Sequence, residues 1–159
     1  MSPPTSGPDE RPDGVNGPML LAHAGLRNTG FLILPVRDTH GVWHQLTVML
    51  KPSQMRVIAL LHEAMLEDQN LPWEARGWRP FNKLAARVEQ LSNYTLEKDS
   101  IRSYITTIRR TVRAAAAKQL PAVDPPSVIE SGAGLGARLA WADLQIIDGT
   151  VPIPGEGRS

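Results

Sequence analysis

The chain has no cysteine among its 159 residues, so disulfide bonds and thiolate metal sites are excluded. It also has no apolar run approaching the roughly 20 residues that a membrane-spanning helix needs. The N-terminus, Met1-Ser2-Pro3-Pro4, lacks the basic patch and the apolar segment of a secretory signal peptide. From these features and the length of the chain, we expect a cytoplasmic protein with one folded domain and no membrane partner.

The formal net charge is only +1, but the charges are unevenly distributed along the chain. Residues 51–139 contain 13 Lys or Arg and 9 Asp or Glu, a net charge of +4, whereas the other 70 residues have a net charge of −3. Residues 98–118 alone contain six basic side chains and a single acid, Asp99. Such a concentration of positive charge predicts contact with a polyanion.

Residues 99–113 read Asp-Ser-Ile-Arg-Ser-Tyr-Ile-Thr-Thr-Ile-Arg-Arg-Thr-Val-Arg. At about 100° per residue of a helix, the apolar side chains fall on one narrow stripe, with Tyr104 at its edge. The stripe consists of Ile101, Ile105, Ile108 and Val112. A second set lies a quarter-turn or more away: Arg102, Thr106, Arg109 and Arg113, flanked by Ser103 and Arg110. We therefore expect one face of this helix to join the core and the other to offer guanidinium groups and hydroxyls to nucleic acid.

Residues 128–139 follow with three glycines, at Gly132, Gly134 and Gly136. A phosphate-binding glycine loop would require a strand before it and a helix directly after it. Here the following residues, Arg138-Leu-Ala-Trp141, indicate a returning strand instead. The glycines therefore predict a tight antiparallel hairpin in which they supply positive φ angles.

Helix and hairpin together resemble the winged-helix output domain of bacterial response regulators of the OmpR/PhoB type. Residues 108–112, Ile-Arg-Arg-Thr-Val, are similar to the basic end of that family's recognition helix. Residues 129–137, Ile-Glu-Ser-Gly-Ala-Gly-Leu-Gly-Ala, are similar to its wing pattern, Ile-Glu-Thr-Val-x-Gly-x-Gly-Tyr. Residues 50–55, Leu-Lys-Pro-Ser-Gln-Met, resemble the opening of its first helix, Leu-Thr-Pro-x-Glu-Phe. The three motifs occur in the family's order and cover roughly residues 28–140.

The resemblance implies an α+β fold: a winged helix-turn-helix with a small N-terminal antiparallel sheet, three helices and a C-terminal β-hairpin wing. We place this domain at residues 28–148, between a disordered N-terminal tail, 1–27, and a flexible C-terminal tail, 149–159. A receiver domain would need well over 100 residues before the winged helix. We therefore expect no receiver domain and no aspartyl-phosphate switch.

Residue patterns place the remaining elements. Two β-rich runs, 31–36 and 42–50, predict a hairpin in which Pro35 lies near an edge or a bulge. The first helix is expected at 52–66, the second at 82–91, and a last short strand at 144–147. Expected buried side chains on the first two helices are Val57, Ile58, Leu60, Leu61, Met65, Leu84, Val88 and Leu91.

The family's activity implies a stand-alone transcription regulator that binds specific double-stranded DNA, with a recognition helix at about 99–117 in the major groove. The side chains expected to contact DNA are Arg102, Ser103, Thr106, Thr107, Arg109, Arg110, Arg113, Lys118 and Arg138. Additional phosphate contacts are expected from Lys83, Arg87 and the N-termini of helices one and two. Relatives often carry Asp at the position of Arg102 and Arg at that of Thr106 or Thr107, so their sequence specificity does not transfer.

The connector at residues 67–80 is longer and more aromatic than the family's usual one. It contains Trp73, Arg76, Trp78 and Arg79. We favour packing of this segment onto helices one and two. The alternative is a patch for a protein partner, such as RNA polymerase or another regulator, in which case the winged helix would serve as an interaction module. A homodimer is also left open.

No motif predicts an enzyme, a cofactor or a metal site. His40 and His44 straddle a predicted turn without a third ligand nearby. His62-Glu63 lacks the second histidine, four residues on, that a zinc-protease helix carries. No nucleophile, base and orienting group can be assembled from the motifs.

Overall fold

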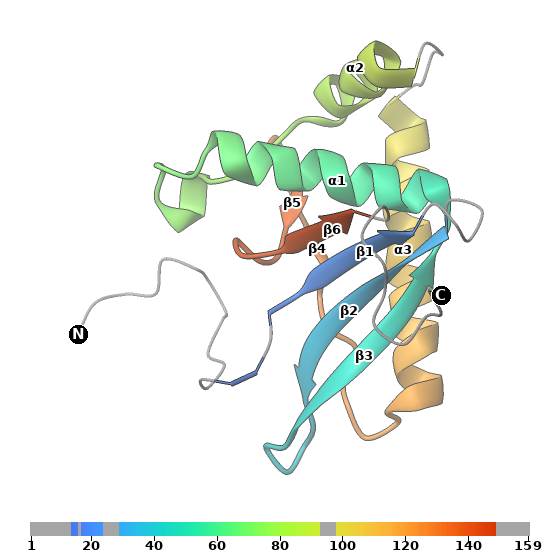
Figure 1. Ribbon diagram of the computed structural model, residues 1–159. Helices are drawn as coiled ribbons and strands as arrows, with labels where there is room; N and C mark the ends of the chain where they lie inside the picture. Colours follow the sequence, from blue (N-terminus) through green and yellow to red (C-terminus); the bar gives the residue numbers. More distant parts are fainter. Residues whose placement is uncertain (1–13, 16, 24–28, 93–97, 149–159) are drawn as a thin grey trace.

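The computed structural model describes residues 14–15, 17–23, 29–92 and 98–148. Within these ranges the chain is an α+β protein in which three α-helices accompany a four-stranded sheet and a separate two-stranded hairpin (Figure 1). The elements are β1 (Met19–His23), β2 (Thr29–Arg37), β3 (Trp43–Leu50), α1 (Pro52–Glu67), the short 3₁₀ helix η2 (Trp73–Ala75), α2 (Phe81–Ser92), α3 (Lys98–Gln119), β4 (Ile129–Gly132), β5 (Gly136–Leu139) and β6 (Gln145–Asp148).

The predicted β2–β3 hairpin is confirmed, and it forms half of a sheet with strand order β3-β2-β1-β6. Alternate residues along it are buried on one face: Leu32, Leu34 and Val36 from β2, with Leu46, Val48 and Leu50 from β3. Pro35 lies beyond the last β1–β2 pair, Met19–Ile33, so among the described strands β2 has only β3 as a neighbour at that point. Proline is tolerated there, as expected for a local edge.

The disordered tail expected over residues 1–27 is wrong for residues 19–23, which form β1. This strand pairs antiparallel with β2 and parallel with β6. The first sheet is therefore mixed rather than antiparallel, and its fourth strand comes from the C-terminal side of the chain. A five-residue run that depends on two distant partners has no local signal strong enough to be read from its own sequence.

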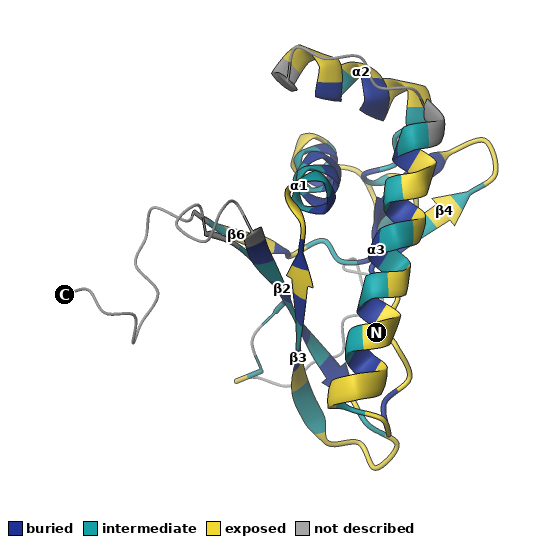
Figure 2. Ribbon diagram, turned by 90° about the vertical axis from the view of Figure 1, so that its right-hand side faces the viewer, coloured by how far each residue is buried: buried dark blue, intermediate teal, exposed yellow. Residues whose placement is uncertain are grey.

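The helices begin and end within two residues of the predicted positions. The apolar stripe of α3 is confirmed, because Ile101, Ile105, Ile108 and Val112 are each at most 2% exposed. On α1 and α2 the expected residues are likewise buried, apart from Leu91, whose side chain lies outside the described part. Figure 2 shows the buried side of α3 turned toward the sheet and α1, and its exposed residues on the opposite side.

The hairpin of β4 and β5 lies beside the end of the connector. Backbone groups of Arg79 and Ala137 exchange two hydrogen bonds of 3.0 Å, so Arg79 forms a one-residue extension of this hairpin. Gly136 has a φ of +94°, and a Cβ there would lie 1.9 Å from the Arg79 carbonyl oxygen. Gly134 also has a positive φ, but Gly132 does not, so the expectation for three such glycines is wrong at Gly132.

None of the helices in the described ranges is both long and apolar enough to cross a lipid bilayer.

Candidate nucleic-acid interface

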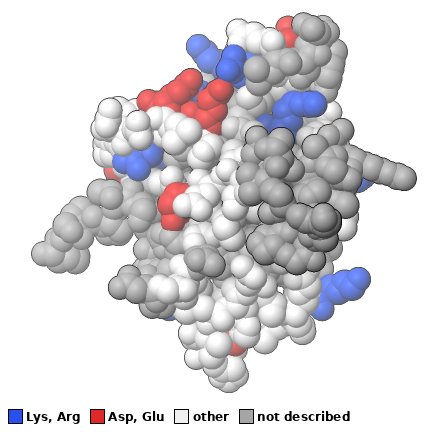
Figure 3. Space-filling view, in the orientation of Figure 1, with Lys and Arg blue, Asp and Glu red and all other residues white. Residues whose placement is uncertain are grey.

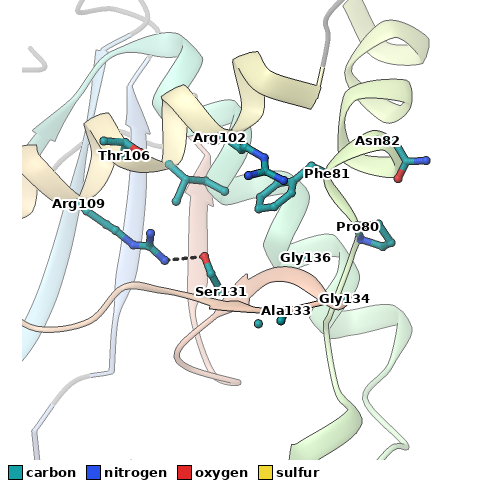
Figure 4. A pocket seen from close by; sticks show the side chains of 12 residues that line it. Pro80, Phe81, Asn82, Arg102, Thr106, Arg109, Ser131, Ala133, Gly134 and Gly136 are labelled. Carbon is teal, nitrogen blue, oxygen red and sulfur yellow. Dashed lines mark hydrogen bonds between the residues drawn. The ribbon is translucent and has the colours of Figure 1, made fainter.

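A groove of about 780 Å³ separates the exposed side of α3 from the β4–β5 hairpin and the start of α2 (Figure 4). It is lined by Pro80, Phe81, Asn82, Arg102, Ile105, Thr106, Arg109, Ser131, Gly132, Ala133, Gly134 and Gly136. None of these lining residues is acidic, and two are arginines. The groove therefore presents positive charge and the Thr106 hydroxyl on the α3 side, and the Ser131 hydroxyl with mostly peptide backbone on the hairpin side.

Arg102 lies in the first turns of α3 and is exposed. Its guanidinium carbon lies 4.7 Å from the centre of the Phe81 ring, so a cation–π contact supports the flat face of the group (Figure 4). With the residues that the structure describes, Arg102 makes neither a hydrogen bond nor an ion pair. Its N–H donors are therefore available along the edges of the guanidinium.

Arg109, two turns further along α3, is half-buried and connects the helix to the hairpin. Its Nη2 donates hydrogen bonds of 2.8 Å to the Ile129 carbonyl oxygen and of 2.8 Å to Ser131 Oγ (Figure 4). Both acceptors belong to β4. Arg109 therefore lines the groove and also fixes the position of the strand that borders it, while its predicted contact with DNA stays a prediction.

The other predicted contacts divide into two sides of α3. Ser103, Thr106, Arg110 and Arg113 are exposed on the groove side or on the outermost line of the helix. Thr107 and Lys118 lie roughly 140–180° around the helix from the Arg102–Arg109 line, on the side toward α1. Thr107 Oγ donates to the Ser103 carbonyl oxygen at 2.9 Å. These two residues are therefore not brought into the groove.

A second hollow, of about 300 Å³, continues from the groove along α3. Arg109 and Arg113 line one side of it, and residues 125–128 line the other. Arg113 is exposed there. The cationic surface of α3 thus extends for three turns, from Arg102 to Arg113.

The expected phosphate contact of Arg138 conflicts with the structure, in which this residue is only 6% exposed. Its Nε donates to Glu130 Oε1 at 2.7 Å, and its Nη1 donates to the carbonyl oxygens of Trp73 and Arg76. The guanidinium carbon lies 4.1 Å from the centre of the Trp73 ring and 4.5 Å from that of Trp78. The connector covers this side of the hairpin and encloses the arginine. The signal available in the sequence was Glu130, which faces Arg138 across the β4–β5 ladder.

The connector side chains that were candidates for a protein partner make contacts inside the fold. Trp78 Nε1 donates to the Glu74 carbonyl oxygen at 3.0 Å, and Arg76 donates to that of Leu71. Arg79 forms ion pairs of 2.9 Å with Asp68 and 2.8 Å with Glu67. The Arg79 hydrogen bond lowers the pKa of Asp68, and in return Asp68 raises the pKa of Arg79. The expected packing onto helices one and two is found only in part: Arg79 binds Glu67 and Asp68 at the end of α1, whereas Trp73 and Trp78 contact Arg138 of the hairpin. A partner patch stays a prediction.

Arg87, expected as an additional phosphate contact, instead binds Glu63 through Nε at 3.0 Å and Nη2 at 2.9 Å. This pairing lowers the pKa of Glu63 and raises that of Arg87. Both residues line a hollow between α1 and α2 together with Glu67 and the exposed Lys83. Figure 3 shows acidic side chains gathered over the C-terminal half of α1, so this side of the molecule has a different charge from the groove.

The N-termini of α1 and α2, both expected to contact phosphate, differ in position. The start of α2 lines the groove through Phe81 and Asn82. At the start of α1, Gln54 Oε1 accepts from the Lys51 N–H at 2.8 Å, and its Nε2 donates to Thr111 Oγ on α3 at 3.3 Å. The α1 terminus is therefore held against the α1-facing side of α3, whereas the α2 terminus faces the groove.

In the described ranges, no three His, Cys, Asp or Glu side chains are grouped so as to hold a metal ion. His44 Nε2 instead lies 2.8 Å from Asp38 Oδ2, at the β2–β3 turn. Burial lowers the pKa of His62, whose Nδ1 finds no hydrogen-bond partner within the described structure.

No protein-family model, curated protein or solved structure matches this chain.

Proposed function

We propose that this chain is a winged-helix protein that binds specific sequences of double-stranded DNA and regulates transcription at the nucleoid. In this proposal α3 is the recognition helix and the β4–β5 hairpin is the wing. The observation that carries it is the groove between them, whose lining combines Arg102, Thr106 and Arg109 with glycine-rich backbone and contains no acid. It is supported by the resemblance of three sequence motifs to the OmpR/PhoB-type output domain.

The dimensions of α3 suit a major groove. An α-helix with its side chains is about 10–12 Å across, and the major groove of B-DNA is about 12 Å wide. The exposed residues of α3 include four that read base edges well, namely Arg102, Ser103, Thr106 and Arg110. Residues on the opposite side of this helix are buried, so the orientation that completes the core also presents these groups outward.

The phosphate contacts of the proposed complex come chiefly from α3. Arg113 lies beside the hollow bordered by residues 125–128, where a backbone phosphate would be accepted. The hairpin tip carries Ala133 and Leu135 and has no cation, and Arg138 is enclosed. The wing therefore contributes backbone N–H groups and shape, while arginines of the helix contribute most of the charge.

Docking of a protein partner through the connector has less support, because Trp73, Trp78 and Arg79 are engaged with Arg138 and the α1 carboxylates. The dependence of affinity on salt concentration distinguishes the two functions. Binding to DNA releases counterions, so its affinity falls steeply with salt concentration, at about 0.9 logarithmic units per tenfold change in salt for each phosphate contacted.

The test is fluorescence anisotropy of the full chain with labelled duplexes selected from a random library, at several salt concentrations. Arg113→Ala, at the proposed phosphate contact, is expected to lower affinity and to reduce the slope of log affinity against log salt concentration by about 0.9, the value of one phosphate contact. Arg37→Ala removes the same charge from the end of β2, outside the groove, and is expected to leave both values unchanged. Absence of binding to any duplex at low salt, or an equal effect of the two variants, would contradict the proposed function.

A further inference from the structure

Two arginines line the groove, but their hydrogen-bonding capacity differs. An arginine reads guanine by placing two parallel N–H bonds on O6 and N7. Only two edges of a guanidinium allow such a pair, the Nε–Nη2 edge and the Nη1–Nη2 edge, and both require a hydrogen on Nη2. The state of Nη2 therefore decides which arginine is able to read guanine in this way.

In Arg109 both Nη2 hydrogens are committed. One bond goes to the Ile129 carbonyl oxygen and the other to Ser131 Oγ, each at 2.8 Å. Arg109 would have to release the hairpin before it could form a paired contact with a base. Its contribution is instead to hold β4 against α3, and through β4 the border of the groove.

In Arg102, unlike Arg109, the face of the guanidinium is in contact with a described residue and its edges are not. The face of its guanidinium rests on the Phe81 ring, at 4.7 Å from the ring centre, and its edges are not engaged by any described residue (Figure 4). Stacking restricts the rotation of the long side chain without using any N–H donor. An exposed, oriented guanidinium at the mouth of the groove is ready for a paired contact.

We propose that Arg102 is the residue that reads a guanine in the DNA target, through bonds to O6 and N7, and that Arg109 is a positioning residue for the hairpin. This inference rests on the proposed function and adds to it a base and the residue that recognises it. Phe81 supports the reading arginine by supplying its stacking platform.

The first experiment compares the sequences selected from a random duplex library by the wild type, Arg102→Ala, Arg102→Lys and Arg109→Ala. Wild type is expected to prefer guanine at one position by about 5- to 150-fold, the range that a paired contact gives. Both Arg102 variants should lose that preference, since lysine keeps the charge but not the fork. Arg109→Ala is the matched comparison and should keep the preference while binding all sequences more weakly.

The second experiment replaces that guanine by 7-deazaguanine, which lacks the N7 acceptor. Wild type and Arg109→Ala should bind the modified duplex more weakly than the unmodified one, and Arg102→Ala should bind both equally. Phe81→Leu keeps apolar bulk at the platform and should reduce the penalty without abolishing it. In the same samples, amide exchange of β4 should increase in Arg109→Ala and stay unchanged in Arg102→Ala.

The outcomes separate the inference from the proposed function. A wild-type chain that selects no duplex contradicts both. A wild-type chain that selects a motif whose guanine preference survives in Arg102→Ala, or disappears in Arg109→Ala, contradicts the inference and leaves the proposed function standing.

Discussion

Arg138 shows how one side chain changes role when its surroundings are included. It lies between the rings of Trp73 and Trp78, pairs with Glu130 and donates to two connector carbonyls. Partners 62 and 65 residues away in the chain are invisible to any local pattern. An arginine on a hairpin strand would ordinarily be assigned to the surface, and here it is the centre of the contact between connector and hairpin.

Arg138→Ala is expected to lower the free energy of unfolding by about 3 kcal/mol, because it leaves backbone acceptors and Glu130 without their donor. The Glu130 side chain is 33% exposed, so Glu130→Gln should lower the free energy of unfolding by less than about 1 kcal/mol. Urea unfolding followed by tryptophan fluorescence measures the free energy of unfolding of both variants, and the indoles of Trp73 and Trp78 report on the site. Equal and small effects would show that the connector does not depend on this contact.

Asp38 carries the one carboxyl in the described structure whose pKa is lowered to about 2, from 3.8. The causes are hydrogen bonds from His44 and from the backbone N–H groups of Val42 and His40. A lowered pKa in the folded state stabilises the fold above pH 3.8, and this contribution is lost as the pH falls toward 2. Between pH 5 and pH 2 wild type should therefore lose more stability than Asp38→Asn. Thermal melts across that range test this, and parallel curves for the two proteins would exclude the role of Asp38.

At the scale of elements, long periodic segments were predictable and contacts between short ones were not. The stripe Ile101–Ile105–Ile108–Val112 defines both α3 and its buried side, because four apolar residues at helical spacing have one arrangement that removes them from water. The strands β1 and β6 have five and four residues and pair with each other, and β1 also pairs with β2. In the groove, the α3 residues were predicted, whereas the Phe81 platform and the hydrogen bonds of Arg109 to β4 required the three-dimensional arrangement.

The β4–β5 hairpin offers a matched pair of glycines. Gly134 and Gly136 both have positive φ, but a Cβ at Gly134 meets open space and one at Gly136 would collide with the Arg79 carbonyl. Gly134→Ala should therefore cost only backbone strain, about 1–2 kcal/mol. Gly136→Ala should cost more than about 2 kcal/mol, because it also breaks the Arg79–Ala137 bridge. Equilibrium unfolding compares them, and equal losses would mean that the bridge adds nothing to stability.

Across the whole molecule, the distribution of charge distinguishes the α1 side from the groove side. The acids Glu63, Glu67 and Asp68 lie on α1 or at its end, paired with Arg87 and Arg79, whereas the described groove lining contains no acid. This separation fits a protein that approaches a polyanion with α3 first, and it would orient the molecule before contact.

The C-terminal end of α3 covers part of the edge of the sheet. β3 is the last strand on its side among the described strands, and its outer edge is occupied at Thr47 by Gln119. The Gln119 side chain accepts from the Thr47 N–H at 3.2 Å and donates to its carbonyl oxygen at 2.6 Å, as a neighbouring strand would. An exposed edge invites pairing with another chain. Gln119→Ala is therefore expected to increase self-association with concentration, measured by sedimentation velocity, while Lys118→Ala, on the exposed neighbouring residue, should behave as wild type. A wild-type dimer that Gln119→Ala weakens would instead place Gln119 within an interface between two copies.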